Sequence, residues 1–265
     1  MGVFGIGQPV RRKEDERFIR GNGCYHDDLA EDGHSHVVFV RSSHAHATIV
    51  NINSDVAKAL PGVIAVWTAA DLKEFDLAGF PCLASIWIPL ERGDGKPAVY
   101  PHNPLLAEGR VRHVGEAVAM IVAETLKIAE EAAELFEIVY EELNAVVETD
   151  KATLSGVPQI HDGVPENKSF VWNHGDQKAT NSAFSSASHV TSISLVNNRV
   201  AVMPIEPRGA IGEYDVKEGK YTLTTNAQHI YDTQLVVSQV LNVDREVIRV
   251  VAKDLGGGFG VKYVS

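Results

Sequence analysis

Residues 247–262 read VIRVVAKDLGGGFGVK, a β-branched run that leads into three consecutive glycines. The run at 247–251 predicts a buried strand that delivers the chain to the glycine loop. Glycines at such a place free backbone N–H groups to converge on an anion or an oxo ligand. Phe259 inside the loop can be held against a bound planar group. A tight turn without a ligand explains the same residues, so the loop alone leaves both interpretations open.

Known nucleotide-binding patterns do not fit this loop. A P-loop requires Gly-Lys followed by Ser or Thr, whereas Lys262 lies between Val261 and Tyr263. A dinucleotide fingerprint requires G-x-G-x-x-G at the start of a helix, and Gly256, Gly258 and Val261 break that pattern. The chain also lacks the motifs G-x-S-x-G and H-E-x-x-H, so no nucleophile constellation or zinc protease site is expected.

Composition limits the class of protein further. The 265 residues carry a formal net charge of −11, which disfavours nucleic acid as a partner because phosphate binding requires basic patches. Cys24 and Cys82 are too few to build an iron–sulfur or structural zinc site by themselves. A reduced intracellular chain fits them better than a disulfide. No signal peptide and no stretch of about 18 apolar residues is present, so we expect a cytoplasmic protein without a membrane span.

Alternating and β-branched patterns predict a succession of short strands. We expect strands at 37–40, 47–52, 63–67, 111–123, 137–140, 190–196, 210–214, 220–225 and 247–251. The clearest predicted helix covers 125–136, where apolar residues share one face. Further helices are expected at 235–241, before Pro61 and after Thr68. Residues 75–103, with four prolines, predict a long loop or a partner-binding surface.

A linker divides the chain into two predicted domains. Residues 149–167 are rich in Gly, Pro and Asp, a composition typical of linkers. We therefore expect a first domain over residues 1–148, which begins with a charged arm that wraps on a neighbouring surface. The second domain is expected over residues 168–265.

Histidine pairs raise the question of a metal site. His34 with His36, and His44 with His46, form two H-x-H pairs, which can offer two imidazoles on one face of a strand. No carboxylate or cysteine stands beside them at ligand spacing, so ordinary strand and turn histidines explain them better. A metal-binding module remains the weaker alternative.

Two more candidates follow predicted strands. Glu206 and Arg208 lie in the turn EPRG (206–209), where an ion pair between them that fixes the loop is favoured over a catalytic role. Gln228 lies between the strand at 220–225 and the next helix, and its amide offers both a donor and an acceptor. Alone, this glutamine is a weak signal.

Taken together, these segments resemble a known family: the chain looks like the N-terminal part of the molybdenum-binding large subunit of xanthine dehydrogenases, aldehyde oxidases and aerobic carbon monoxide dehydrogenases. Any one motif is weak, but their order and spacing make a strong match. The motifs are GIGQPVRRKED (5–15), RFIRG (17–21), YHDD (25–28), VRSSHAHA (40–47), PGV (61–63), VGEAVA (114–119), AAEL (132–135), EPRG (206–209), Gln228 and GGGFGVK (256–262). The resemblance implies an α+β fold, with an α/β-hammerhead domain followed by the beginning of a molybdopterin-binding domain.

The resemblance also implies a cofactor site. In the family, the loop that matches Gly257, Gly258, Phe259 and Gly260 lies beside the molybdenum, and a backbone N–H with the glutamine matching Gln228 bonds the apical oxo ligand. The phenylalanine packs near the substrate pocket. Family members hydroxylate aldehydes or heteroaromatic carbons, or oxidise carbon monoxide, with oxygen from water. The iron–sulfur clusters and FAD would lie on a small and a medium partner subunit, in a dimer of heterotrimers when complete.

Departures from the family pattern narrow these expectations. Val261 and Tyr263 stand where purine-oxidising members have glycine and glutamate, so the chain looks closer to the carbon monoxide dehydrogenase-like branch. The family's base glutamate and its other pterin contacts lie further on, so no catalytic residue and no metal ligand is assigned here. The leading hypothesis is a portion of a molybdenum hydroxylase large subunit that is inactive without the remaining polypeptide and the partner subunits. The alternative is a non-catalytic docking or assembly module for iron–sulfur and flavin subunits.

Overall fold

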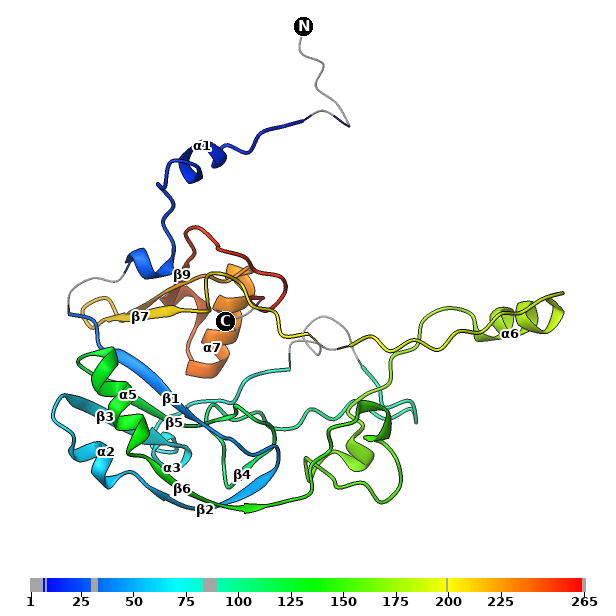
Figure 1. Ribbon diagram of the computed structural model, residues 1–265, viewed down its shortest axis with the longest axis horizontal. Coiled ribbons are helices and arrows are strands. Elements are labelled where there is room, and N and C mark those ends of the chain that lie inside the picture. Colours follow the sequence, from blue (N-terminus) through cyan, green and yellow to red (C-terminus); the bar gives the residue numbers. More distant parts are fainter. Residues whose placement is uncertain (1–6, 8, 30–32, 83–89, 199, 264–265) are drawn as a thin grey trace, which may run out of the picture. The chain divides into compact units, whose positions relative to one another are not determined.

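The computed structural model describes residues 7, 9–29, 33–82, 90–198 and 200–263 (Figure 1). Contacts divide the chain into two compact units. The first unit comprises residues 33–200 and 239–242, and the second comprises residues 1–32, 201–238 and 243–265. The charged segment at the start of the chain thus groups with the glycine loop at its other end.

Two antiparallel sheets form the centre of the unit that starts at residue 33 (Figure 1). In order across the first sheet lie β1 (His36–Arg41), β5 (Ala117–Ala123) and β3 (Val63–Thr68). In order across the second lie β4 (Arg110–Val111), β2 (Ala47–Asn53) and β6 (Glu137–Glu142). Strand β5 is the central strand of its sheet, and four of its seven residues are buried.

Helices α2 (Asp55–Ala59) and α5 (Leu126–Glu134) pack on the first sheet and on each other. Their small buried residues, Ala57 on α2 and Ala129 with Ala132 on α5, let the helices approach Val66 and Ile121 of the sheet closely. Helix α5 begins at Thr125, whose side chain accepts a hydrogen bond from the Ile128 N–H at 3.2 Å. A second buried cluster joins strands β2 and β4 of the second sheet to β5 of the first, and consists of Ala47, Ala107, Val111 and Val118.

The remaining elements of this unit are helices and single turns outside the two sheets. Helix α3 (Ala69–Leu72) begins with a reciprocal capping box between Thr68 and Asp71. Single 3-10 turns η2 (Thr149–Lys151) and η3 (Pro165–Asn167) lie in the predicted linker. Helix α6 (Gln177–Ser186) is capped by Asp176 and has no buried residue.

The other unit contains a three-stranded sheet and most of one long helix. Strands β7 (Ala210–Asp215) and β8 (Lys220–Thr225) form an antiparallel hairpin, and β8 pairs in parallel with β9 (Ile248–Val251). A parallel pair requires a crossover connection, which α7 (Ile230–Leu241) and the turn η4 (Arg245–Val247) provide. Helix α1 (Asp15–Phe18) and the turn η1 (His26–Leu29) lie in the N-terminal segment.

The structure confirms most of the predicted elements and corrects three. Residues 190–196 form no strand, and their side chains are exposed. The strand expected at 111–123 is interrupted between β4 and β5, where Gly115 adopts a φ of +86°. Helix α6 was not predicted because it buries no residue and presents no apolar face to a core. Its Phe184 side chain is 62% exposed. Hydrophobic periodicity detects only elements that bury one side.

Candidate functional site

The glycine loop follows β9 and adopts backbone conformations that favour glycine. The φ angles are +101° at Gly257 and +86° at Gly260. Phe259 has a φ of +51°, which is uncommon for a bulky side chain and marks local strain of the kind found at functional sites. Its ring is 74% exposed. The loop therefore presents an aromatic face from a strained backbone.

Some amides of the loop are bound within the chain and others remain available. Gly260 N–H donates to Oε1 of Gln228 at 2.9 Å, and Val261 N–H donates to the Gly258 carbonyl at 3.1 Å. Within the described ranges of the chain, the N–H groups of Gly257, Gly258 and Phe259 have no hydrogen-bond acceptor. Three successive backbone donors without an acceptor are the donor set that suits an anion or an oxo group.

Gln228 is held directly against this loop. Its own N–H donates to the Lys262 carbonyl at 2.7 Å, while its side-chain oxygen accepts from Gly260. A Cβ added at Gly258 would lie 2.5 Å from Cδ of Gln228, so glycine is needed there for the side chain to lie over the backbone. The structure thus brings together all five residues of the predicted site, from Gln228 to Gly260.

Asn226, two residues earlier, explains why Gln228 reaches the loop. The Asn226 side chain is 2% exposed and bridges the turn before β7, since it donates to the Pro207 carbonyl at 2.7 Å and accepts from Gly209 N–H at 3.2 Å. The end of β8 is thereby tied to the EPRG turn. Gln228 follows two residues later and contacts the glycine loop.

A buried ion pair anchors the glycine loop. Lys262 is fully buried, and its Nζ lies 2.9 Å from Oε2 of Glu206. The same carboxylate accepts from Gly256 N–H at 2.7 Å and from His26 N–H at 3.1 Å. Burial alone would raise the pKa of Glu206, but the hydrogen bonds from Lys262, Gly256 and His26 outweigh it and lower the pKa to about 2. Glu206 therefore carries a negative charge at neutral pH.

This pairing corrects the expected partner of Glu206. The sequence pattern favoured an ion pair with Arg208, two residues away, but the carboxylate turns instead to Lys262. The reason is desolvation: Lys262 is fully buried, and a buried ammonium needs a carboxylate at hydrogen-bond distance. The expected role, fixing a loop, is retained with a different partner.

A second carboxylate, Asp254, anchors the start of the loop. It forms a two-pronged ion pair with Arg17, in which Nη2 lies 2.7 Å from Oδ1, and it accepts from Cys24 N–H at 2.7 Å. The hydrogen bonds from Arg17 and Cys24 lower the pKa of Asp254 to about 2. Neither Asp254 nor Arg17 was singled out in the sequence, although RFIRG belongs to the motifs quoted above.

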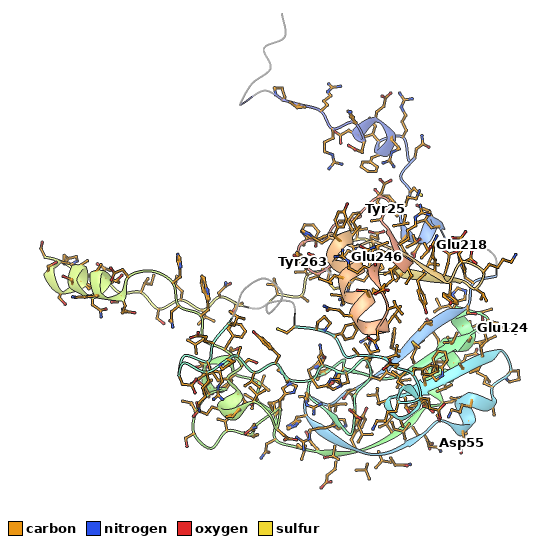
Figure 2. The ribbon with its side chains drawn as sticks, turned by 180° about the vertical axis from the view of Figure 1, so that it is seen from behind. Tyr25, Asp55, Glu124, Glu218, Glu246 and Tyr263 are labelled. Carbon is orange, nitrogen blue, oxygen red and sulfur yellow. The ribbon has the colours of Figure 1, made fainter. Side chains whose placement is uncertain are left out.

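Tyr263 closes the loop on the side of α7. Its hydroxyl donates to Oδ2 of Asp232 at 2.9 Å, and its ring lies against that of His229 with centroids 4.3 Å apart. The hydrogen bond to Asp232, together with burial, raises the pKa of Tyr263. The side chains of this unit, with Tyr25 and Tyr263 labelled, are drawn in Figure 2.

The histidine pairs lie in the other unit and have structural partners. His46 is 4% exposed and its Nδ1 lies 2.8 Å from the Asn144 carbonyl, while the His44 ring packs on Tyr140 with centroids 4.7 Å apart. Among the residues that the structure describes, no three His, Cys, Asp or Glu side chains gather as a metal site.

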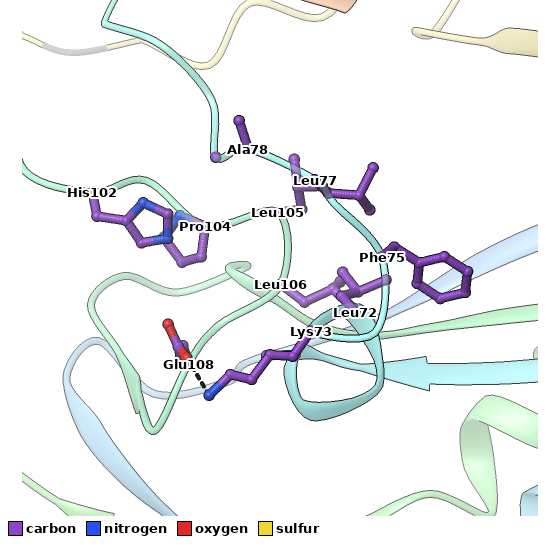
Figure 3. A pocket seen from close by; sticks show the side chains of 12 residues that line it. Leu72, Lys73, Phe75, Leu77, Ala78, His102, Pro104, Leu105, Leu106 and Glu108 are labelled. Atoms are coloured by element: carbon purple, nitrogen blue, oxygen red, sulfur yellow. Dashed lines mark ion pairs between the residues drawn. The ribbon is translucent and has the colours of Figure 1, made fainter. Parts of the chain in front are cut away.

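A hollow of about 240 Å³ lies in the unit that contains the two sheets (Figure 3). It is lined mainly by apolar residues of α3 and the loops on either side, and Lys73 and Glu108 form an ion pair of 2.7 Å at its wall. That ion pair lowers the pKa of Glu108. None of the residues from the glycine loop lines this hollow.

No helix in the described part of the chain is long and apolar enough to cross a membrane.

Two family models match the chain in tandem. Residues 20–144 match the a/b hammerhead domain of aldehyde oxidase and xanthine dehydrogenase. Residues 160–265, which include Gln228 and the whole glycine loop, match the molybdopterin cofactor-binding domain. The expected fold, a hammerhead domain followed by the beginning of a molybdopterin-binding domain, is confirmed.

Curated relatives and solved structures agree with these matches. The chain is 36% identical to the nicotine 6-hydroxylase large subunit of Paenarthrobacter nicotinovorans, over 97% of this chain and 30% of the relative. It is also 36% identical to the carbon monoxide dehydrogenase large chain of Afipia carboxidovorans, over 97% of this chain and 32% of that one. The crystal structure of the Cu,Mo-CO dehydrogenase superposes with a TM-score of 0.82 at 34% identity, over 97% of this chain and 32% of the other. The chain thus spans about a third of the length of the relatives it matches.

Proposed function

Because the chain belongs to the family of aldehyde oxidases, xanthine dehydrogenases and carbon monoxide dehydrogenases, we propose that it is a portion of a molybdenum hydroxylase large subunit and forms one wall of the molybdopterin site. The observation that carries this proposal is the glycine loop, with its three available N–H groups at residues 257–259. The loop lies inside the segment matched by the cofactor-binding model.

The donor set of the loop fits such a group. A molybdenum–pterin cofactor presents oxo and phosphate oxygens, and backbone N–H groups in a glycine-rich turn are suited to bind them. When bound, the cofactor would supply the hydroxylation of an aldehyde or heteroaromatic carbon, or the oxidation of carbon monoxide, with oxygen from water.

Each residue of the proposed site has its own part. Gly257, Gly258 and Phe259 would donate their N–H groups to the cofactor. Gln228 holds the loop through Oε1, which leaves its amide nitrogen as a further donor toward an oxo ligand. The exposed ring of Phe259 would form a wall of the substrate pocket and exclude water from it.

The substrate class is proposed from the residues beside the loop. Val261 and Tyr263 differ from the glycine and glutamate of the purine-oxidising pattern, and the Tyr263 hydroxyl is engaged by Asp232. The identities agree with this choice, since they are 36% to a nicotine hydroxylase and to a carbon monoxide dehydrogenase, against 30% and 28% to xanthine dehydrogenase subunits of Bacillus subtilis and Escherichia coli. We therefore propose that the chain belongs to the carbon monoxide dehydrogenase-like branch.

Further polypeptide would complete the site. The relatives are about three times as long, and no residue of this chain is assigned as the base. Large apolar side chains on the stretch before the EPRG turn support a missing neighbour, since Ile193, Leu195 and Ile205 are 79%, 78% and 100% exposed. The proposed domain limits are 1–148, a linker at 149–167, and 168–265.

Partner subunits complete the proposal. The relatives are large subunits or chains, or subunit gamma of a dehydrogenase complex. These names indicate that the relatives assemble with other chains. We propose an iron–sulfur small subunit and a flavin medium subunit as the partners, in a cytoplasmic dimer of heterotrimers.

Cofactor content tests this function. The tagged chain is purified, with the polypeptides that accompany it, from cells that make molybdopterin, and its molybdenum and pterin are measured. Gly258→Ala pushes Gln228 off Gly260 and is expected to lower cofactor occupancy about fivefold at limiting cofactor, the equivalent of one hydrogen bond. Gly212→Ala on β7 is the matched control, because its Cβ would meet nothing within 4 Å.

Two outcomes would count against the proposal. A stable complex that contains flavin and iron–sulfur proteins but no molybdopterin would support the docking or assembly module instead. Equal cofactor occupancy in the wild type and in Gly258→Ala would show that the glycine loop is not the cofactor wall.

A further inference from the structure

The N-terminal segment and the glycine loop are joined by contacts that span almost the whole sequence. Arg17 and Asp254 are 237 residues apart, and Cys24 and Asp254 are 230 apart. These residues belong to the same compact unit. Long-range contacts of this kind cost chain entropy to form, so their number at one short segment calls for an explanation.

We infer that the segment from Arg17 to His26 is a positioning element of the glycine loop, which acts through the carboxylates of Asp254 and Glu206. Only the description of the loop as a cofactor wall rests on the function proposed above. The contacts between the segment and the loop are independent of it.

Asp254 connects the segment to the start of the loop. Its two side-chain oxygens are both engaged, one by each prong of the Arg17 guanidinium, and Oδ2 also accepts from Cys24 N–H at 2.7 Å. In the reverse direction, Asp254 N–H donates to the Cys24 carbonyl at 3.1 Å. The Asp254 side chain is 12% exposed and that of Arg17 is 40% exposed, so water reaches this ion pair mainly from the side of Arg17. The residue two positions before the first loop glycine is thereby fixed in orientation.

Glu206 connects the segment to the loop itself. One oxygen accepts from His26 N–H, and the other accepts from Gly256 N–H and from the buried Lys262 ammonium. The His26 ring also packs closely on Gly209, where an added Cβ would lie 2.5 Å from two ring atoms. The first glycine and the lysine that closes the loop are thus held by one carboxylate, which the N-terminal segment holds in turn.

The two carboxylates also affect the unbound N–H donors of residues 257–259. These donors lie between the two anchored points, Gly256 and Gly260, and their directions follow from those of the anchors. Arg17 touches none of the three donors, so it is a positioning residue and not a catalytic one. Binding groups must be held within a fraction of an ångström, and that precision comes from the residues behind them.

Amide hydrogen exchange of the intact chain tests the inference without any cofactor. Arg17→Gln is expected to speed exchange of the hydrogen-bonded loop amides, those of Asp254, Gly256 and Gly260, about tenfold, the equivalent of one charge-assisted hydrogen bond, while β7 and β8 keep their rates. Arg20→Gln is the matched control, because it removes an exposed ion pair with Glu16 from the same segment. Arg17→Lys is expected to give an intermediate rate, since an ammonium cannot engage both oxygens as the guanidinium fork does.

Three results would overturn the inference. The loop could exchange at the wild-type rate in Arg17→Gln, or Arg20→Gln could have the same effect. Exchange could also rise equally in β7, β8 and the loop, which would reveal general destabilisation; the milder Arg17→Lys decides this if Arg17→Gln does not fold.

Failure of the inference and failure of the proposed function are separable. Faster loop exchange with unchanged molybdenum content of the purified complex would support the positioning role and contradict the cofactor wall. Unchanged exchange would contradict the positioning role whatever the cofactor content.

Discussion

The hammerhead region and the glycine-loop region are stabilised by different kinds of buried side chain. The hammerhead buries aliphatic residues, with Ile121, Val111 and Val118 fully covered. The glycine-loop unit buries few aliphatic residues, and its buried set is mainly polar: Thr225, Asn226, Thr233, Ser238 and Lys262. Apolar burial is non-directional and tolerates small shifts, whereas a hydrogen-bonded network depends on geometry and charge.

The stability of each region should therefore respond to a different kind of substitution. The stability of the hammerhead should follow mainly apolar volume and should depend less on pH, through carboxylates such as Glu108 whose pKa is lowered. The glycine-loop unit should respond to the removal of single charges, because a buried charge left without its partner is costly. The polar network is suited to a binding site, since it orients backbone donors that an apolar core would leave unspecified.

The largest expected effect is that of Lys262→Met. The Glu206 carboxylate would lose its buried cation, and breaking a buried pair in this way costs about 3–5 kcal/mol. Urea unfolding of the chain measures the loss. Lys220→Met is the control, because it breaks only a solvent-exposed pair with Glu218, whose loss should leave the free energy of unfolding nearly unchanged. If both variants unfold alike, the buried pair of Lys262 and Glu206 does not stabilise the glycine-loop unit more than an exposed pair does.

Acidification should separate the regions next. The depressed pKa of Glu206 contributes stability that is complete above its ordinary value of 4.5 and is lost as the pH falls toward about 2. The loss is on the order of 3 kcal/mol. Asp254 adds to it in the same direction between 3.8 and about 2. Hydrogen exchange at stepped pH, corrected for the intrinsic rate, should show the loop opening before β5.

Glu206→Gln provides the control for this pH dependence. The amide cannot ionise, so the part of the acid sensitivity that belongs to Glu206 should disappear in the variant. A wild-type loop that stays closed down to pH 2 would contradict the account of both carboxylates.

The smallest expected effect compares two helix caps. Thr125→Ala removes the cap of α5, whose Ala129 and Ala132 lie in the hammerhead core, and should cost about 1 kcal/mol of global stability. Asp176→Ala removes the cap of α6, which buries no residue, and should melt only that helix. Urea midpoints together with far-ultraviolet circular dichroism distinguish the two. A shift of the midpoint by Asp176→Ala would show that α6 packs on the core.

Elements that bury one face were predictable from the sequence. The strands near 37–40, 63–67 and 220–225 and the helix from Thr125 showed β-branched runs or an apolar stripe, and each is present. The segment 190–196 shows the same kind of pattern without forming a strand, because no strand in the described part of the chain pairs with it. Alternation indicates a tendency, and a strand forms only where a partner accepts its hydrogen bonds.

The local chemistry of the site follows from the amino-acid sequence alone. Gly257 and Gly260 permit the positive φ angles of the loop, and Gly256 and Gly258 leave room for the side chains of Glu206 and Gln228. Gln228 follows the strand β8, which ends at residue 225. The motif order also pointed to the family, which the two family models confirm.

Which charged side chains pair with each other depends on the folded structure. Glu206 was expected to bind Arg208 but selects Lys262, 56 residues away, and Asp254 selects Arg17 from the other end of the chain. Sequence spacing carries no information about such pairs, because electrostatic partners are chosen by proximity and burial after folding. The donors of the glycine loop come from local sequence, and their orientation comes from contacts that the fold alone creates.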